Sequence, residues 1–140
     1  MAAAVVVPTL ALSLASATAC RSAQVAAPAP PPALETHTGV ATFYGPAFHG
    51  RTTASGVPFD MHAMVAAHPT LPFGSLLRIT NLTNGRTVDV RVVDRGPARG
   101  PRSTGVIVDL SRGAAERLDF VPLGRVRIRL DVLQLGDDAR

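Results

Sequence analysis

The stretch VRVVDRGP, residues 90–97, begins as a β-strand and ends as a sharp turn. Apolar residues at positions 88, 90 and 92 alternate with charged residues at 89 and 91, the period of a strand with one buried face. Asp94 follows where this alternation ends, and Gly96-Pro97 terminates the strand. A carboxylate at the end of a core strand is held firmly enough for general acid or base work. The simpler alternative is that Asp94 pairs with Arg95 or caps the turn.

Strand-like segments surround this stretch on both sides. Asn84-Gly85 predicts a hairpin into the 87–93 strand. Asp109 or Ser111 can cap a short helix over residues 114–118. About six short strands and one short helix predict a small all-β barrel. The strand-like segments are residues 40–44, 63–67, 75–80, 87–93, 105–108 and 124–132.

Composition limits the partners and the chemistry. The 140 residues suffice for one domain, and the 14 basic residues, all Arg, give a net charge of +4. A basic surface suits a polyanion such as nucleic acid, anionic lipid or an acidic cell-wall polymer, but the few aromatic residues make nucleic acid the weakest choice, and we expect no nucleic-acid partner. Cys20 is the only cysteine, which excludes an internal disulfide. The spacing of His49, His62, His68 and Asp60 fits no standard metal site, so we expect no metal or cofactor.

The N-terminal third differs from the rest. Residues 1–19 are small and apolar and end in an A-x-A sequence, which predicts a signal peptide, although no basic residue precedes the apolar run. Cys20 follows directly, so acylation of Cys20 and plain secretion both stay open, with an ordinary N-terminal extension as a third alternative. Residues 20–36 form a Pro/Ala-rich linker, 37–134 the barrel and 135–140 a polar tail. We expect an exported protein of the cell envelope or periplasm, either lipid-anchored to a membrane or secreted.

Short motifs follow one another between residues 38 and 133. They are ATFYGP (41–46), FHG (48–50), TASG (53–56), FDM (59–61), AAHPTLP (66–72), TNL (80–82), NGR (84–86), VDRGP (93–97) and VDLS (108–111). In this order they resemble the RlpA family, the rare lipoprotein A-like septal lytic transglycosylases of bacteria. The resemblance implies a six-stranded double-psi β-barrel that acts as a lyase on peptidoglycan.

The resemblance also implies a reaction. Family members cleave the bond between N-acetylmuramic acid (MurNAc) and N-acetylglucosamine (GlcNAc) without water, leave a 1,6-anhydro end, and prefer naked glycan strands. An acid must protonate the leaving oxygen and a base must take the proton of the muramic 6-hydroxyl; one carboxylate can do both in turn, or two can divide the work. We expect a monomer whose partner is the glycan strands of peptidoglycan.

Two residues match the catalytic positions of the family. The resemblance implies that Asp94 is the acid/base and that His68 assists it, by orienting Asp94 or by donating to the sugar. Characterised members carry a Glu directly after the TASG motif, where this chain has Val57. Valine transfers no proton, so Val57 favours a rival hypothesis: a non-catalytic, expansin-like barrel that binds peptidoglycan.

Three further residues are candidates for substrate binding. Tyr44 can stack on a sugar face, or it can be a half-buried strand end with a bonded hydroxyl. Arg95 can bind the lactyl carboxylate of muramic acid, or simply pair with Asp94. Asp60 lies three residues beyond Val57, a shift that misplaces a loop carboxylate by several ångströms, so we do not expect it to replace the missing Glu.

Overall fold

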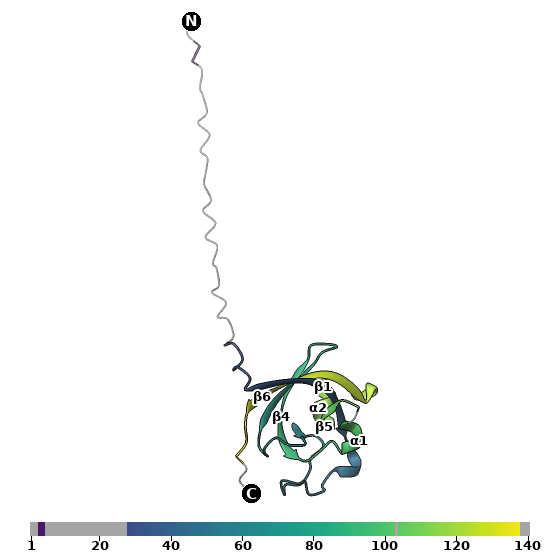
Figure 1. The fold of residues 1–140 in the computed structure, drawn as a ribbon. Helices are drawn as coiled ribbons and strands as arrows, with labels where there is room; N and C mark the ends of the chain where they lie inside the picture. The colour runs from purple at the N-terminus through teal and green to yellow at the C-terminus, as the bar shows by residue number, and fades with distance from the viewer. Residues whose placement is uncertain (1–2, 5–27, 103, 138–140) are drawn as a thin grey trace.

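A computed structural model describes residues 3–4, 28–102 and 104–137 of the chain. The described elements are β1 (Glu35–Tyr44), η1 (Pro46–Phe48), β2 (Val65–Ala67), β3 (Leu76–Asn81), β4 (Thr87–Asp94), α1 (Arg99–Arg102), β5 (Val106–Ser111), α2 (Arg112–Arg117), η2 (Val121–Leu123) and β6 (Arg125–Gln134). The strands close into one barrel (Figure 1). Around the barrel their order is β1-β5-β2-β4-β3-β6. The predicted all-β, six-stranded barrel is confirmed.

Parallel and antiparallel pairs alternate around part of this barrel. β1 pairs in parallel with β5, β2 pairs in parallel with β4, and β2 and β5 run antiparallel between them. Parallel neighbours cannot be joined by a tight hairpin, so their connections must cross an end of the barrel. This topology brings the ends of strands that are distant in sequence onto one side of the molecule.

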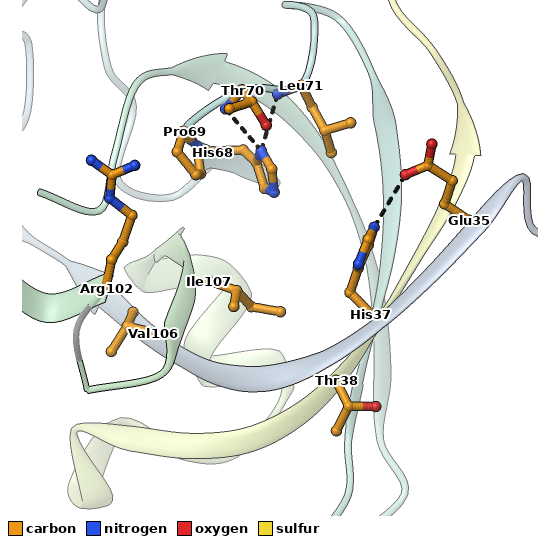
Figure 2. A pocket seen from close by; sticks show the side chains of 10 residues that line it. All are labelled: Glu35, His37, Thr38, His68, Pro69, Thr70, Leu71, Arg102, Val106 and Ile107. Atoms are coloured by element: carbon orange, nitrogen blue, oxygen red, sulfur yellow. Dashed lines mark hydrogen bonds and ion pairs between the residues drawn. The ribbon is translucent and has the colours of Figure 1, made fainter. Parts of the chain in front are cut away.

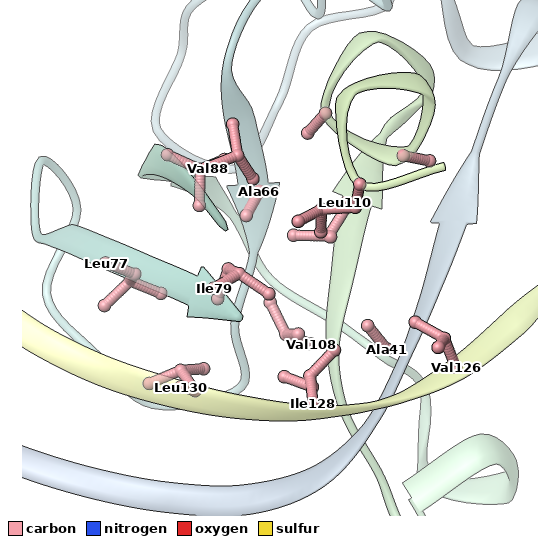
Figure 3. Packing of buried hydrophobic residues seen from close by; sticks show 14 of the residues in the cluster. Ala41, Ala66, Leu77, Ile79, Val88, Val108, Leu110, Val126, Ile128 and Leu130 are labelled. Atoms are coloured by element: carbon pink, nitrogen blue, oxygen red, sulfur yellow. The ribbon is translucent and has the colours of Figure 1, made fainter. Parts of the chain in front are cut away.

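The core follows from strict alternation along the strands. In β4 the residues at 88, 90 and 92 are buried and those at 87, 89 and 91 are exposed, and β6 alternates in the same way from 125 to 130. Figure 3 shows side chains from several strands meeting inside the barrel. The largest fully buried hydrophobic side chains are Phe120, Leu77, Ile79, Leu110, Leu118, Ile128 and Leu130.

Helix α2 begins where a side chain caps it. The Ser111 hydroxyl accepts a hydrogen bond from the Ala114 backbone N–H at 3.2 Å, so the helix starts at residue 112, two residues before the predicted start. The same hydroxyl donates to the Ala63 carbonyl at 2.6 Å and ties the helix to the segment before β2. Gly113 permits this approach, because a Cβ there would lie 2.5 Å from the His62 carbonyl oxygen. The sequence did not predict α1, which shows no apolar periodicity.

The barrel begins two residues before the predicted boundary at 37. Glu35 pairs with Val132 in β6, and the Thr36 hydroxyl donates to Asp131 at 2.8 Å, so both residues belong to β1 rather than to the linker. The predicted signal segment is described only at residues 3–4, and Cys20 lies outside the described residues. Among the described residues, no helix has the length and apolar character needed to cross a membrane.

Candidate active site at the end of strand β4

Asp94 owes its orientation to a shift in strand register. Ala66 pairs with Val92, but Ala67 pairs with Asp94, so Val93 is an additional residue on β4. Without this shift, the two-residue period would place Asp94 on the same face as Val92, which is fully buried in the core. A bulge re-aims the side chains that follow it. Here the bulge turns the Asp94 side chain away from the core, and this side chain is partly exposed.

Asp94 is fixed by its neighbours through one oxygen. Oδ1 accepts a hydrogen bond from the Ala54 backbone N–H at 2.9 Å and another from the Arg95 backbone N–H at 2.8 Å. The Ser55 N–H also donates to the carbonyl of the bulged Val93 at 3.2 Å, so residues 52–58 dock onto the end of β4. Among the described residues, Asp94 Oδ2 receives no hydrogen bond, which leaves this oxygen for a substrate.

His68 is held beside Asp94 in one tautomer. Its backbone N–H donates to the Asp94 carbonyl at 3.1 Å. Its ring Nδ1 accepts from the backbone N–H groups of Thr70 and Leu71, at 3.2 and 3.0 Å. Nδ1 is therefore unprotonated, and the proton of the neutral ring is on Nε2. Partial burial, with the positive charges of His37 and Arg95 nearby, lowers the pKa of His68 from 6.5 to about 4, so the ring is neutral at pH 7.

The Arg95 side chain supports the His68 loop and forms no ion pair with Asp94. Its guanidinium lies 3.8 Å from the centre of the Phe73 ring and donates to the carbonyls of Leu71 at 2.9 Å and His68 at 3.4 Å. The expected side-chain pairing with Asp94 is therefore wrong, since only the Arg95 backbone N–H reaches that carboxylate. A substrate-binding role for Arg95 stays a prediction; the residue also lines a cavity of about 290 Å³ with Gly96 and Pro97.

Tyr44 packs through its ring and keeps a free hydroxyl. The ring stacks on Phe59 at 4.2 Å between centroids and meets Phe48 edge to face, so one face is already occupied. The hydroxyl is buried and has no hydrogen-bond partner among the described residues, which differs from the bonded hydroxyl that was the alternative. Burial raises the pKa of Tyr44, and the negative charges of Asp94 and Asp109 raise it further.

Asp109 is the residue of this site that sequence reasoning did not single out. The sequence indicates Asp109 only as a candidate helix cap, and in the structure Ser111 has that role. Its neighbours Val108 and Leu110 are fully buried in the core, so Asp109 projects from the opposite face of β5. The Thr42 hydroxyl of β1 donates to Asp109 Oδ1. Burial raises the pKa of Asp109, and the Thr42 hydrogen bond partly opposes that effect.

A groove lies beside His68. Its volume is about 430 Å³, and Figure 2 shows the His68 ring above it, with Ile107 below and the hydrogen-bonded pair of His37 and Glu35 at one side. Arg102 of α1 lines the opposite side. The groove combines an apolar floor with polar groups at its edges, as is usual for sites that bind small molecules or chain ligands. Asp94 is not part of this lining.

Comparison with known proteins agrees with this geometry. A family model described as lytic transglycolase, of the double-psi β-barrel type, matches residues 36–130. The chain is 46% identical over 102 residues to the endolytic peptidoglycan transglycosylase RlpA of Campylobacter jejuni, covering 73% of this chain and 36% of that protein. It is also 46% identical over 104 residues to the protein of the same name from Neisseria meningitidis serogroup B, covering 74% and 42%. The chain belongs to the RlpA family.

Solved structures of other proteins share the RlpA barrel. The Streptomyces papain inhibitor superposes with a TM-score of 0.58 at 26% identity, over 75% of this chain and 100% of that one. The Clavibacter michiganensis expansin superposes with a TM-score of 0.56 at 24% identity, over 74% and 52%. These likenesses concern the fold alone, because one fold hosts many unrelated functions. The chain spans about two fifths or less of the length of the RlpA relatives named above.

Val57 directly follows the TASG motif, where the resemblance to the family implies a glutamate. It lies in the loop that docks onto β4, where its carbonyl accepts from the Thr53 N–H at 2.9 Å and from the Thr53 hydroxyl at 2.7 Å. Its side chain is 46% exposed and supplies no polar group. Position 57 lies three residues along this loop from Ala54, whose backbone N–H contacts Asp94.

Asp60 does not join Asp94. Its Oδ1 accepts from the His62 backbone N–H at 2.8 Å and lies 3.9 Å from His49 Nδ1. The rings of His49 and His62 are 5.8 Å apart, so these three residues form a local cluster of their own. Among the described residues, no group of three or more His, Cys, Asp or Glu side chains has the geometry of a metal site. Binding of substrate by Asp60 stays a prediction.

Proposed function

We propose that this chain is an endolytic peptidoglycan transglycosylase that cleaves MurNAc–GlcNAc bonds and leaves 1,6-anhydro ends. In this reaction the muramic O6 forms a bond to C1 while the bond from C1 to the GlcNAc O4 breaks. The O6 proton passes to a base, and O4 takes a proton from an acid. The names of the RlpA relatives support this reaction, and the site supplies groups suited to it.

The observation that carries the proposal is the presentation of Asp94. Two backbone N–H groups hold Oδ1 and leave Oδ2 free, at the end of a strand anchored in the core. A fixed carboxylate with one free oxygen suits removal of the O6 proton, because proton transfer depends on positioning to within a fraction of an ångström. Asp94 thus has the role of the base.

His68 has the role of a neutral donor. Since Thr70 and Leu71 occupy Nδ1, the ring offers only Nε2–H to a ligand. A neutral N–H donor beside the groove suits a sugar hydroxyl or an N-acetyl oxygen. The described hydrogen bonds of the ring do not include Asp94, so donation to the sugar is the better supported of its two roles.

The rival function is glycan binding without cleavage, and Val57 is the observation that favours it. To separate the two, the full chain is incubated with stem-peptide-free glycan strands, and the products are analysed by mass spectrometry beside Asp94→Asn. Anhydromuramic ends that disappear in the variant support the enzyme. Retention of glycan without products from the wild-type chain supports the binding module.

The cellular setting follows from the same proposal. Its partner is the glycan of peptidoglycan, naked strands being preferred, and its location is the cell envelope. Acylation of Cys20, cleavage after Ala19, a septal location and a monomeric state stay predictions. Mass spectrometry of the mature protein distinguishes an acylated Cys20 from a free N-terminus.

A further inference from the structure

The proposed reaction leaves one role unfilled. A base removes the O6 proton, and an acid must protonate O4 in the same cleavage. Val57 has no proton to give, and Asp60 is engaged with the His62 backbone in its own turn. One carboxylate can make both proton transfers in turn, but where two groups divide the work and Asp94 is the base, the acid is another residue.

Asp109 lies in one row with Asp94 across four neighbouring strands. Thr42 of β1 pairs with Asp109 of β5, Asp109 pairs with Ala67 of β2, and Ala67 pairs with Asp94 of β4. Residues directly opposite each other project to the same face of a sheet, so Asp94 and Asp109 share a face on either side of Ala67. Two strand spacings of about 4.8 Å put their Cα atoms about 10 Å apart.

The side chain of Asp109 leans toward the turn that follows Asp94. A Cβ placed on Gly96 would lie 3.3 Å from Asp109 Oδ2 and 3.4 Å from the Ala67 Cβ. Glycine at position 96 thus admits the second carboxylate to the site. Inverting glycosidases place their acid and base carboxyls about 6.5 to 9.5 Å apart, and retaining ones place their two carboxyls about 5 to 5.5 Å apart. Two carboxylates on one face of neighbouring strands are on the scale of such a pair.

The surroundings of Asp109 suit the acid role. The carboxyl is partly buried, its Oδ1 accepts from Thr42, and burial raises its pKa, which favours the protonated form. The Tyr44 hydroxyl is buried without a hydrogen-bond partner among the described residues, and the charges of both Asp94 and Asp109 act on it. Two carboxyl groups in such different surroundings are the usual basis for dividing acid from base.

We infer that Asp109 is the second carboxylate of this active site and protonates the leaving GlcNAc O4, while Asp94 takes the proton of the muramic O6. This inference rests on the proposed function. In one turnover the bond from O6 to C1 forms, the bond from C1 to O4 breaks, Asp94 gains a proton and Asp109 loses one. Exchange with water restores both groups before the next cleavage.

The first test compares aspartate variants of the full chain on naked glycan strands. Asp109→Asn is expected to lower the rate of anhydro-end formation by about 100- to 10,000-fold. The control is Asp89→Asn, the same change on β4 at a residue paired with Arg78 outside the site, and it is expected to leave the rate unchanged. A rate for Asp109→Asn within threefold of wild type overturns the inference, whereas a wild-type chain that forms no anhydro ends overturns the proposed function itself.

The second test separates an acid from a structural residue. An aryl glycoside of MurNAc with a nitrophenolate leaving group needs no proton on its leaving oxygen. Asp109→Asn is expected to cleave it within about threefold of wild type, while Asp94→Asn remains inactive because O6 must still lose its proton. Equal losses on glycan and aryl glycoside would assign Asp109 a structural role and overturn the inference.

The third test does not depend on removing the carboxylate. The Thr42 hydrogen bond lowers the pKa of Asp109, so Thr42→Val is expected to raise it. The alkaline limb of the pH profile of kcat/KM reports the pKa of the acid in the free enzyme, and we expect this limb to move to higher pH in Thr42→Val. An unmoved limb in a variant with wild-type thermal stability contradicts the acid role.

Discussion

Asp94 and Asp109 lie opposite the same residue, Ala67, on the two strands that flank β2. One carboxylate reaches this position through a bulge and the other through ordinary alternation. The parallel pairing of β2 with β4 and the antiparallel pairing of β2 with β5 are what align them. The barrel topology thus builds a two-carboxylate site from residues that are 15 positions apart in the sequence.

The first prediction concerns position 57. If Asp109 is the acid, a glutamate at 57 adds little to the wild-type chain, and we expect Val57→Glu to change its rate less than about threefold. In the Asp109→Asn background the same substitution supplies a new carboxyl on a loop that contacts Asp94, and we expect a gain of at least about tenfold. Anhydro-end formation on naked glycan measures both.

The matched control at this position is Val57→Gln, which has the size of glutamate but transfers no proton. It is expected to give no gain in either background. A large gain from Val57→Glu in the wild-type chain would instead show that the chain lacks an acid, in conflict with the role inferred for Asp109.

The second prediction separates the two nitrogens of His68. Asparagine places an acceptor near the position of Nδ1, so His68→Asn is expected to keep the N–H bonds from Thr70 and Leu71 while losing the Nε2 donor. Glutamine places its amide nearer to Nε2 and loses the loop acceptor. We expect His68→Asn to keep the wild-type melting temperature and lose activity, and His68→Gln to melt lower. The opposite order would show that the ring acts mainly by holding the loop.

The third prediction follows from the lowered pKa of His68. The unfolded chain takes up a proton near pH 6.5 and the folded ring only near pH 4, so the unfolded state binds more protons between these values. Stability is therefore lost as pH falls from about 6.5 to about 4. In urea unfolding at pH 7 and pH 4.5, the stability of His68→Asn relative to wild type should be higher at the lower pH. If the stability difference between His68→Asn and wild type is the same at both pH values, the pKa of His68 is the same in the folded and the unfolded chain.

The fourth prediction concerns Arg95 as a support of the His68 loop. Arg95→Lys keeps the charge and the backbone N–H to Asp94 but loses the planar stack on Phe73, and we expect a loss of about 1–2 kcal/mol in the free energy of unfolding. Arg129→Lys on β6, an exposed Arg paired with Asp131, is the control and should change stability by less than about 0.5 kcal/mol. Thermal unfolding followed by circular dichroism measures both. Equal losses would show that the Phe73 contact contributes nothing.

The sequence predicted what depends on local pattern. The alternation in residues 87–93 and 124–132 predicted strands, and Asn84-Gly85 predicted the hairpin between β3 and β4, where Gly85 has a φ of 76°. The motif order led to Asp94 and His68, which the barrel brings into backbone contact. The observed β1 is longer than the predicted 40–44 strand because residues 35–39 carry no strand pattern and pair only with β6.

The sequence could not predict what depends on register. Nothing in the residues around Val93 shows that it is an additional residue, and with strict alternation Asp94 would have pointed into the core. The sequence around Asp109 indicates only a helix cap. Its proximity to Asp94 depends on the pairing of both strands with β2, a three-residue strand with little sequence pattern of its own. The neighbouring Asp94 suggests an ion pair for Arg95. In the structure the Arg95 guanidinium instead contacts a backbone carbonyl and an aromatic ring, which lie more than 20 residues away in the sequence.

The last prediction tests the environment of Asp109 without any assay of activity. Because burial raises its pKa in the folded state, the folded chain keeps this proton at a pH where the unfolded chain has lost it. Wild-type stability therefore falls as pH rises through the interval between the pKa values of Asp109 in the unfolded and the folded chain. The Asp109→Asn variant has no carboxyl at this position, so its stability does not fall for this reason. The amide still accepts from Thr42, so the variant should unfold at a higher urea concentration than wild type at pH 7, with the difference shrinking or reversing at pH 3. If Asp109→Asn is less stable at pH 7 than at pH 3, each relative to wild type, the carboxylate is stabilised in the fold as an anion and would be a poor general acid.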